Sequence, residues 1–162
     1  MGSARPEETL RHALSRQHRA FITGDVIIDL ATVDTDGAPL IAIGHGCAVS
    51  TRSPRVAVLV ERGQCAAFPA VLSRTRSTAA TFGRAPDHEA IQIKGADCTI
   101  VAAGSAELAI ASAYRTRLAR QFALLGLGPA GTEVYLGTPP GELAVLRFTP
   151  TAVFQQTPGP QA

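Results

Sequence analysis

The chain has 162 residues, of which 46% are hydrophobic and 17% charged, with a net charge of +2. This length suits a single domain over residues 1–162, whose core needs neither a metal nor a disulfide. No dense Lys/Arg stripe indicates nucleic-acid binding, and no apolar run approaches the ~20 residues of a membrane span. We therefore expect a cytoplasmic protein that binds neither nucleic acid nor a membrane.

Cysteine usage excludes two further classes of protein. Cys47, Cys65 and Cys98 are odd in number, are scattered along the chain and include no CxxC pair. This pattern fits neither a disulfide framework nor a zinc site. We expect three small buried side chains and no metal.

The first predicted element is a helix over residues 7–23. Pro6 suits a first helical turn and Gly24 a helix end, and apolar residues recur between them at helical spacing: Leu10, Ala13, Leu14 and Phe21.

Residues 25–104 carry the pattern of strands. An apolar run over 26–33 is followed by Asp36-Gly37 and a second run over 38–49, which predicts a β-hairpin. Gly44 and Gly46 in the second run indicate a bulge or the close approach of another group. His45 between them shares the apolar face of that strand, where a satisfied core histidine is the simplest interpretation.

Further strands are predicted over 55–60, over 78–82 and from residue 89 past residue 100, with a possible bulge at Gly95. A short helix is predicted over 65–76, with Pro69 in or near its first turn.

The C-terminal third begins with a long helix over 105–126, capped by Ser105. Its expected buried stripe comprises Leu108, Ala111, Leu118, Phe122 and Leu125. Gly- and Pro-rich residues 126–141 are predicted to be largely irregular. A final strand over 142–155 and a tail over 156–162 complete the chain.

This order of elements is mainly β with added helices. No βαβ alternation, GxGxxG string or Walker loop is present, which disfavours the parallel-sheet nucleotide folds.

Three strings resemble known sequences. Residues 31–39, ATVDTDGAP, resemble the opening hairpin of pyridoxamine 5′-phosphate oxidase-like proteins. Residues 84–95, RAPDHEAIQIKG, and the ending 153–160, VFQQTPGP, resemble one subgroup of the same family, whose function is largely unassigned. The matches occur in the family's order along most of the chain.

The resemblance implies a split β-barrel of about six antiparallel strands with flanking helices. It also implies a homodimer with FMN bound between the subunits, although some relatives bind haem or F420 instead. Activities in the family include oxidases and reductases, so the fold does not fix the reaction.

The expected phosphate site departs from the family pattern. An FMN phosphate requires Arg, Lys, hydroxyl or backbone N–H donors. Arg62 stands where the oxidase has Thr, and Ala66, Ala67 and Phe68 replace its Ser, Arg and Lys. Arg62 could clamp the phosphate together with Gln64 and the following helix N-terminus, or it could be an ordinary turn arginine.

Other candidate cofactor-binding residues follow from the resemblance. Lys94 could meet an anionic ligand, and Gln92 could hydrogen-bond a flavin edge, unless both simply face solvent. His45, with Gly46 beside it, and His88 could transfer protons or ligate haem, although His88 could instead shape its turn. We assign no catalytic residue.

Two functions therefore remain open. The first is an FMN-dependent oxidoreductase of the pyridoxamine 5′-phosphate oxidase-like type, acting on an unidentified small molecule. The second is a non-enzymatic homodimer that binds haem or another ligand and has lost FMN binding.

Overall fold

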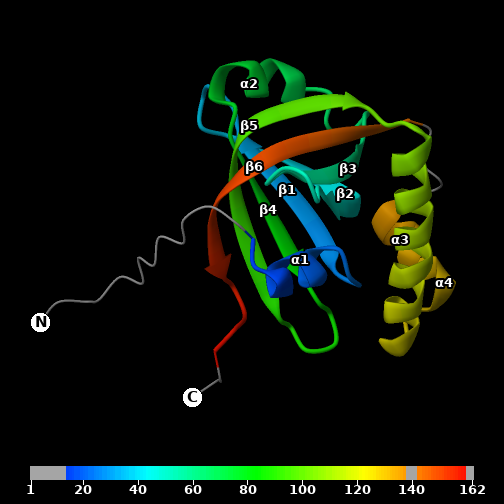
Figure 1. Ribbon diagram of the computed structural model, residues 1–162. Helices are drawn as coiled ribbons and strands as arrows, with labels where there is room; N and C mark the ends of the chain where they lie inside the picture. Colours follow the sequence, from blue (N-terminus) through cyan, green and yellow to red (C-terminus); the bar gives the residue numbers. More distant parts are fainter. Residues whose placement is uncertain (1–13, 138–141, 160–162) are drawn as a thin grey trace, which may run out of the picture.

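The computed structural model describes residues 14–137 and 142–159. Six antiparallel strands form a closed barrel in the order β1-β2-β3-β6-β5-β4 (Figure 1). The strands are β1 (Ile27–Val33), β2 (Pro39–Val49), β3 (Val56–Glu61), β4 (Thr78–Gly83), β5 (Ala90–Ala102) and β6 (Leu143–Gln155). This architecture confirms the mainly β fold class that the sequence predicts.

The predicted hairpin joins β1 to β2. The side chain of Asp34 accepts the backbone N–H groups of Asp36 and Ala38, at 2.9 and 2.8 Å. Gly37 adopts a φ of 83°, which few other residues tolerate. Turn chemistry local to the sequence therefore sets this connection.

The two glycines beside His45 allow β2 to bulge. The register of β2 against β3 shifts between Gly44 and Cys47. A Cβ on Gly44 would lie 2.6 Å from the Ile28 side chain, while Gly46 has a φ of 134°. Both positions exclude other residues, one by packing and one by backbone conformation.

A third glycine lies at an irregularity in the pairing of β5 with β6. A Cβ on Gly95 would lie 2.1 Å from the Phe148 ring, and the register shifts between Lys94 and Gly95. The bulge predicted at Gly95 is present, because the buried Phe148 ring needs the space.

Two short helices contact the barrel. α2 (Phe68–Thr75) has Pro69 in its first turn, as expected, and buries Phe68 and Leu72 in the barrel core. α1 (Arg16–Ile22) begins after Ser15, whose extended backbone and hydroxyl cap it through the N–H of His18. Of the helix predicted over 7–23, residues 14, 15 and 23 are not helical, and residues 7–13 lie outside the described part.

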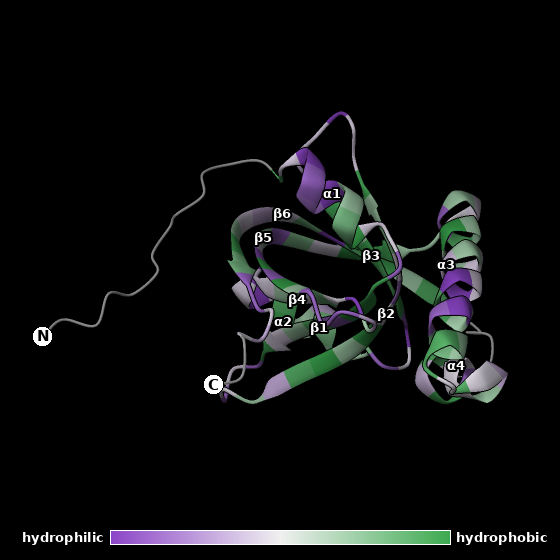
Figure 2. Ribbon diagram, turned by 90° about the horizontal axis from the view of Figure 1, so that it is seen from below, coloured by the Kyte–Doolittle hydropathy of each residue, from purple (hydrophilic) through white to green (hydrophobic). Residues whose placement is uncertain are grey.

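α3 (Ser105–Leu124) lies on the outside of the barrel against β2 (Figure 2). Gly104, rather than Ser105, is its N-cap, and its N–H donates to the Glu107 carboxylate. The buried stripe comprises Tyr114, Leu118 and Phe122. Leu108 and Leu125, predicted to be buried, are about half exposed.

The Gly- and Pro-rich stretch contains a helix that composition did not predict. α4 (Gly128–Leu136) packs beside α3. Pro129 sits in its first turn, where a missing N–H costs nothing. Tyr135 meets Phe122 edge to face at a centroid distance of 5.8 Å. Packing on α3 therefore outweighs the weak helix propensity; residues 138–141 lie outside the described part.

The hydrophobic core fills the interior of the barrel and extends to the interface between the barrel and α3. Its fully buried large side chains include Ile28, Leu30, Phe82, Ile93 and Phe148. Cys47, Cys65 and Cys98 are free and buried, as predicted.

Candidate functional site

The α2 cavity lies beside α2 and has a volume of about 360 Å³. Arg62 is its only charged lining residue among the described part of the chain. The other lining residues are Cys65, Ala66, Pro69, Ile100, Val101, Ala102 and Ala144. The end of β3, the beginning of α2 and the end of β5 thus form a mainly apolar cavity with one guanidinium.

Arg62 pairs with Glu142 across 3.1 Å. Both side chains are more than half exposed, so the pair contributes little to stability and can open at little cost. No side chain caps α2, whose first turn begins beside the same cavity. An anion entering the cavity would therefore meet Arg62 and the positive end of the α2 dipole.

Gln64 does not line the α2 cavity. Its Oε1 accepts the Ile43 N–H at 3.1 Å, and its Nε2 lies 3.4 Å from a Glu61 carboxylate oxygen. The side chain thus ties its turn to β2 rather than extending the predicted clamp.

His45 is 2% exposed and lies where the β2 bulge meets α3. Burial lowers the pKa of His45, Glu61 opposes that shift, and Arg115 adds to it. Nε2 has no hydrogen-bond partner among the described residues, so His45 is buried but not the satisfied core histidine expected. Gly46 beside it faces Ile110 of α3 and does not line the α2 cavity.

Gln92 and Lys94 share the outer face of β5, away from the α2 cavity. The Gln92 amide donates to the Thr81 hydroxyl at 3.3 Å. The Lys94 ammonium lies 5.1 Å from the centroid of the Phe154 ring. Both side chains thus contact other residues of the sheet, which fits the alternative that they belong to its solvent-facing surface.

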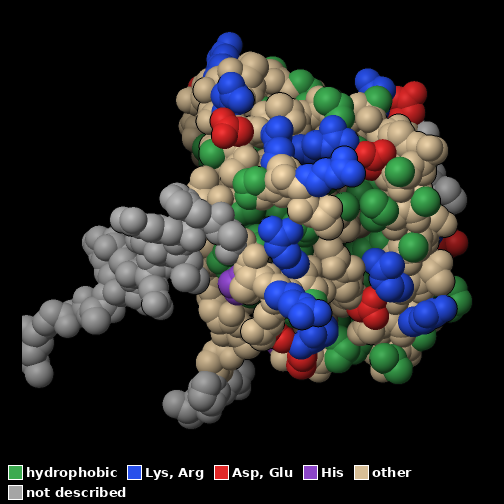
Figure 3. Space-filling model, viewed as in Figure 1, with side chains coloured by type: hydrophobic (Ala, Val, Ile, Leu, Met, Phe, Trp, Pro, Cys, Tyr) green, Lys and Arg blue, Asp and Glu red, His purple; other side chains and the backbone are tan. Residues whose placement is uncertain are grey.

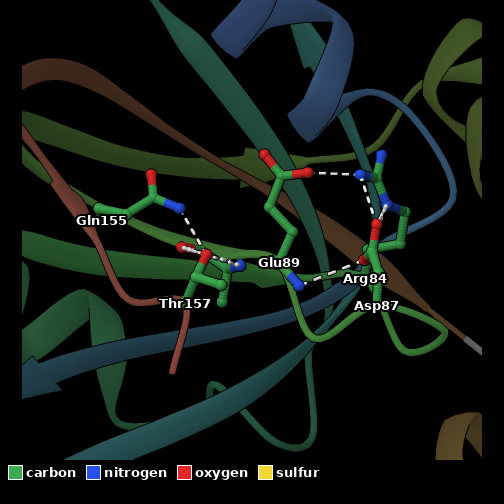
Figure 4. A network of polar contacts seen from close by, with 6 residues as sticks. Arg84, Asp87, Glu89, Gln155 and Thr157 are labelled. Carbon is green, nitrogen blue, oxygen red and sulfur yellow. Dashed lines mark hydrogen bonds and ion pairs between the residues drawn. The ribbon is translucent and has the colours of Figure 1, made fainter. Parts of the chain in front are cut away.

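His88 lies in the turn between β4 and β5, with a left-handed φ of 58°. Arg84 bridges the carboxylates of Asp87 and Glu89 across this turn (Figure 4). His88 also lines a second cavity of about 320 Å³, which we call the tail cavity. Its other lining residues are Ile27, Asp29, Thr81, Gly83, Arg84, Ala85, Glu89, Ala90, Gln156 and Pro158.

The predicted site residues therefore occupy separate places. Arg62 lines the α2 cavity, His88 lines the tail cavity, and His45 is enclosed near α3. Sequence reasoning missed Asp29 and Thr81 of the tail cavity. Asp29 had a visible signal, since it is the only charged residue in the apolar run over 26–33.

Within residues 14–137 and 142–159, no group of three or more His, Cys, Asp or Glu side chains could hold a metal ion. No helix there has the length and apolar character needed to cross a bilayer.

No family model and no curated protein matches this chain. Among solved structures, a provisionally named pyridoxamine 5′-phosphate oxidase from Lactobacillus delbrueckii is 17% identical, with a TM-score of 0.53 over 90% of this chain and 98% of that one. A conserved hypothetical protein from Mycobacterium tuberculosis is 12% identical, with a TM-score of 0.51 over 99% and 97%.

HupZ from Group A Streptococcus is 14% identical, with a TM-score of 0.50 over 92% of this chain and 99% of that one. At such identities the likeness concerns the fold alone. The chain therefore has the split-barrel fold of the pyridoxamine 5′-phosphate oxidase-like proteins.

Proposed function

We propose that this protein binds FMN in the α2 cavity and uses it as an oxidoreductase on a small molecule. The observation that carries the proposal is Arg62, an accessible guanidinium at a mainly apolar cavity beside the uncapped start of α2. The apolar wall suits a flavin ring, and Arg62 suits its phosphate. When bound, FMN would supply the redox chemistry.

The protein's own contribution is binding and orientation. Arg62 exchanges Glu142 for the phosphate, and the backbone at the start of α2 adds its dipole. Ile100 and Val101 supply apolar surface and keep water from one side of the ligand.

FMN titration followed by quenching of flavin fluorescence tests this proposal. We expect saturable binding that weakens roughly tenfold in Arg62→Ala, the loss of one charge-assisted contact. Arg52→Ala, in an exposed turn, is the matched control and should bind like the unmodified protein. Absence of quenching in the unmodified protein would refute FMN binding; with binding present, flavin reduction by NADH or NADPH tests the activity.

We further propose a homodimer. Large hydrophobic side chains are exposed on the hairpin and on α3 and α4, including Ile41 at 63%, Leu124 at 75% and Val134 at 86%. Hydrophobic side chains also reach the surface at several places on the face in Figure 3. Exposed apolar area of this kind supports binding of a protein partner. Sedimentation equilibrium of the unmodified protein and of the double variant Leu124→Glu/Val134→Glu tests the homodimer. A monomeric unmodified protein at every concentration would refute it.

The non-enzymatic alternative is favoured by one observation, the lack of any second basic side chain lining the α2 cavity among the described residues. A haem-binding version would depend on His88, because His45 is enclosed. Haem titration should then give a Soret band that changes in His88→Ala but not in His45→Ala. An unchanged band in His88→Ala would exclude that ligation.

A further inference from the structure

Two segments far apart in the sequence meet at the edge of the tail cavity. The N–H of Gln156 donates to the Ala90 carbonyl oxygen at 2.8 Å, and the N–H of Ala90 donates to the Thr157 hydroxyl at 3.1 Å. Figure 4 shows Thr157 beside the start of β5, with Glu89 between it and Arg84. The string 84–95 and the C-terminal string, both prominent in the sequence, thus form one wall.

The floor of the cavity consists of paired residues on the outer face of β1, β4 and β5. Thr81 pairs with Asp29 on one side and with Gln92 on the other, while Gly83 pairs with Ile27 and Ala90. Directly paired residues share a face of the sheet. Gly83 has no side chain, and a Cβ there would meet only the Ala90 Cβ at 4.0 Å, so the floor is hollow at this point.

Negative charge exceeds positive charge around this floor. Arg84 is the only Lys or Arg side chain lining the cavity among the described residues, and it is bound by both Asp87 and Glu89. The Glu89 N–H also donates to the Asp87 carboxylate at 3.2 Å. These contacts together stabilise the turn between β4 and β5. Asp29 has no ion pair with a Lys or Arg side chain among the described residues.

Among the described residues, the Asp29 side chain has one polar contact, a hydrogen bond from the Tyr135 hydroxyl at the long distance of 3.4 Å. Its carboxylate therefore retains most of its acceptor capacity. The Thr81 hydroxyl lies on the same row, and the apolar side chains of Ile27, Ala85 and Pro158 also line the cavity. An acceptor pair beside an apolar wall suits a ligand with a cationic head and a short hydrocarbon part.

We propose that the tail cavity binds a small organic ammonium ion. The ammonium group donates to the Asp29 carboxylate and the Thr81 hydroxyl, and the hydrocarbon part covers Gly83 and Ala90 against Ile27 and Pro158. The tail cavity and the α2 cavity have no lining residue in common. This site is therefore independent of FMN binding.

The test uses benzylamine as the cationic probe and benzyl alcohol as its neutral counterpart, titrated into the full chain and followed by amide chemical shifts. We expect saturable shifts at residues 81–90 with benzylamine and much weaker ones with benzyl alcohol. Asp29→Asn should weaken benzylamine binding roughly tenfold or more, because a charge-assisted contact is lost. Asp36→Asn, in the exposed hairpin turn, should leave it unchanged.

Gly83→Val provides a second variant that changes shape rather than charge. The φ of Gly83 suits other residues, and its side chain would enter the hollow floor, so the fold should persist while benzylamine binding is lost. Amide dispersion and melting temperature verify folding of each variant. Equal binding of both probes, unsaturable shifts, or unchanged affinity in Asp29→Asn would overturn the proposal; FMN titration of the same samples reports separately on the α2 cavity.

Discussion

The hydroxyl of Tyr114 donates a 2.9 Å hydrogen bond to the carbonyl oxygen of Val26, joining α3 to the segment that enters β1. Tyr114 is 1% exposed and Val26 is also 1% exposed, so water cannot replace either group. This contact helps to hold the middle of α3 against the barrel.

Replacing Tyr114 with Phe should therefore destabilise the fold. The Val26 carbonyl loses a buried donor, which costs about 1–3 kcal/mol of unfolding free energy. Urea denaturation measures the loss. Tyr135→Phe is the matched control, since its hydroxyl makes only a 3.4 Å contact with a solvent-accessible carboxylate, and it should cost clearly less. Equal losses in the two variants would contradict this account of α3.

Gly95→Ala should destabilise the barrel through overpacking. The new methyl group would lie 2.1 Å from the Phe148 ring, which is fully buried and cannot move aside. The expected loss is about 1–3 kcal/mol or more in denaturant unfolding. Gly83→Ala, on the neighbouring strand with 4.0 Å to its nearest atom, should be nearly neutral. An unchanged stability in Gly95→Ala would show that the pairing of β5 with β6 can relax around the new methyl group.

His45 should make stability depend on pH in the mildly acidic range. Burial lowers the pKa of His45 in the fold, with Arg115 acting in the same direction and Glu61 opposing. The folded state therefore holds fewer protons than the unfolded chain once the pH falls below about 6.5, the ordinary histidine value. The contribution of neutral His45 to the free energy of unfolding is complete above that pH. It is lost as the pH falls toward the lower pKa of His45 in the folded state.

The measurement is the melting temperature from pH 8 to pH 5 in the unmodified protein and in His45→Gln. The variant should have a flatter profile across this range, whatever its absolute stability. His88→Gln is the control and should keep the original slope. A slope unaffected by His45→Gln would assign the acid sensitivity to other groups.

The three thiols should be unreactive in the folded protein. Burial raises the pKa of Cys98 to about 11 and raises those of Cys47 and Cys65 as well. Thiolate is the reactive form, so both low ionisation and poor access protect these side chains. A colorimetric disulfide reagent at pH 8 should label fewer than one thiol before unfolding and all three in urea. Rapid labelling of one thiol in the native protein would contradict this burial.

Several local features followed from the sequence alone. Asp36-Gly37 between two apolar runs predicted the hairpin, because contacts between neighbours in the chain, such as that of Asp34 with Ala38, hold the turn. Glycines at positions 44, 46 and 95 predicted irregular strands because few other residues fit there.

α4 shows the limit of local reasoning. Its Gly and Pro content suggested irregular structure, whereas its packing against α3, which includes the contact of Tyr135 with Phe122, stabilises it as a helix. The exposure of Leu108 and Leu125 likewise depends on how much of α3 touches the barrel.

The candidate site shows the same division. The family pattern laid onto the sequence indicated Arg62, and the resemblance of the string 84–95 indicated the segment around His88. Only the barrel closure places Asp29 beside Thr81 and brings Gln156 to Ala90. These neighbours are 52 and 66 positions apart, and their pairing follows from strand order, which a local pattern of residues does not encode.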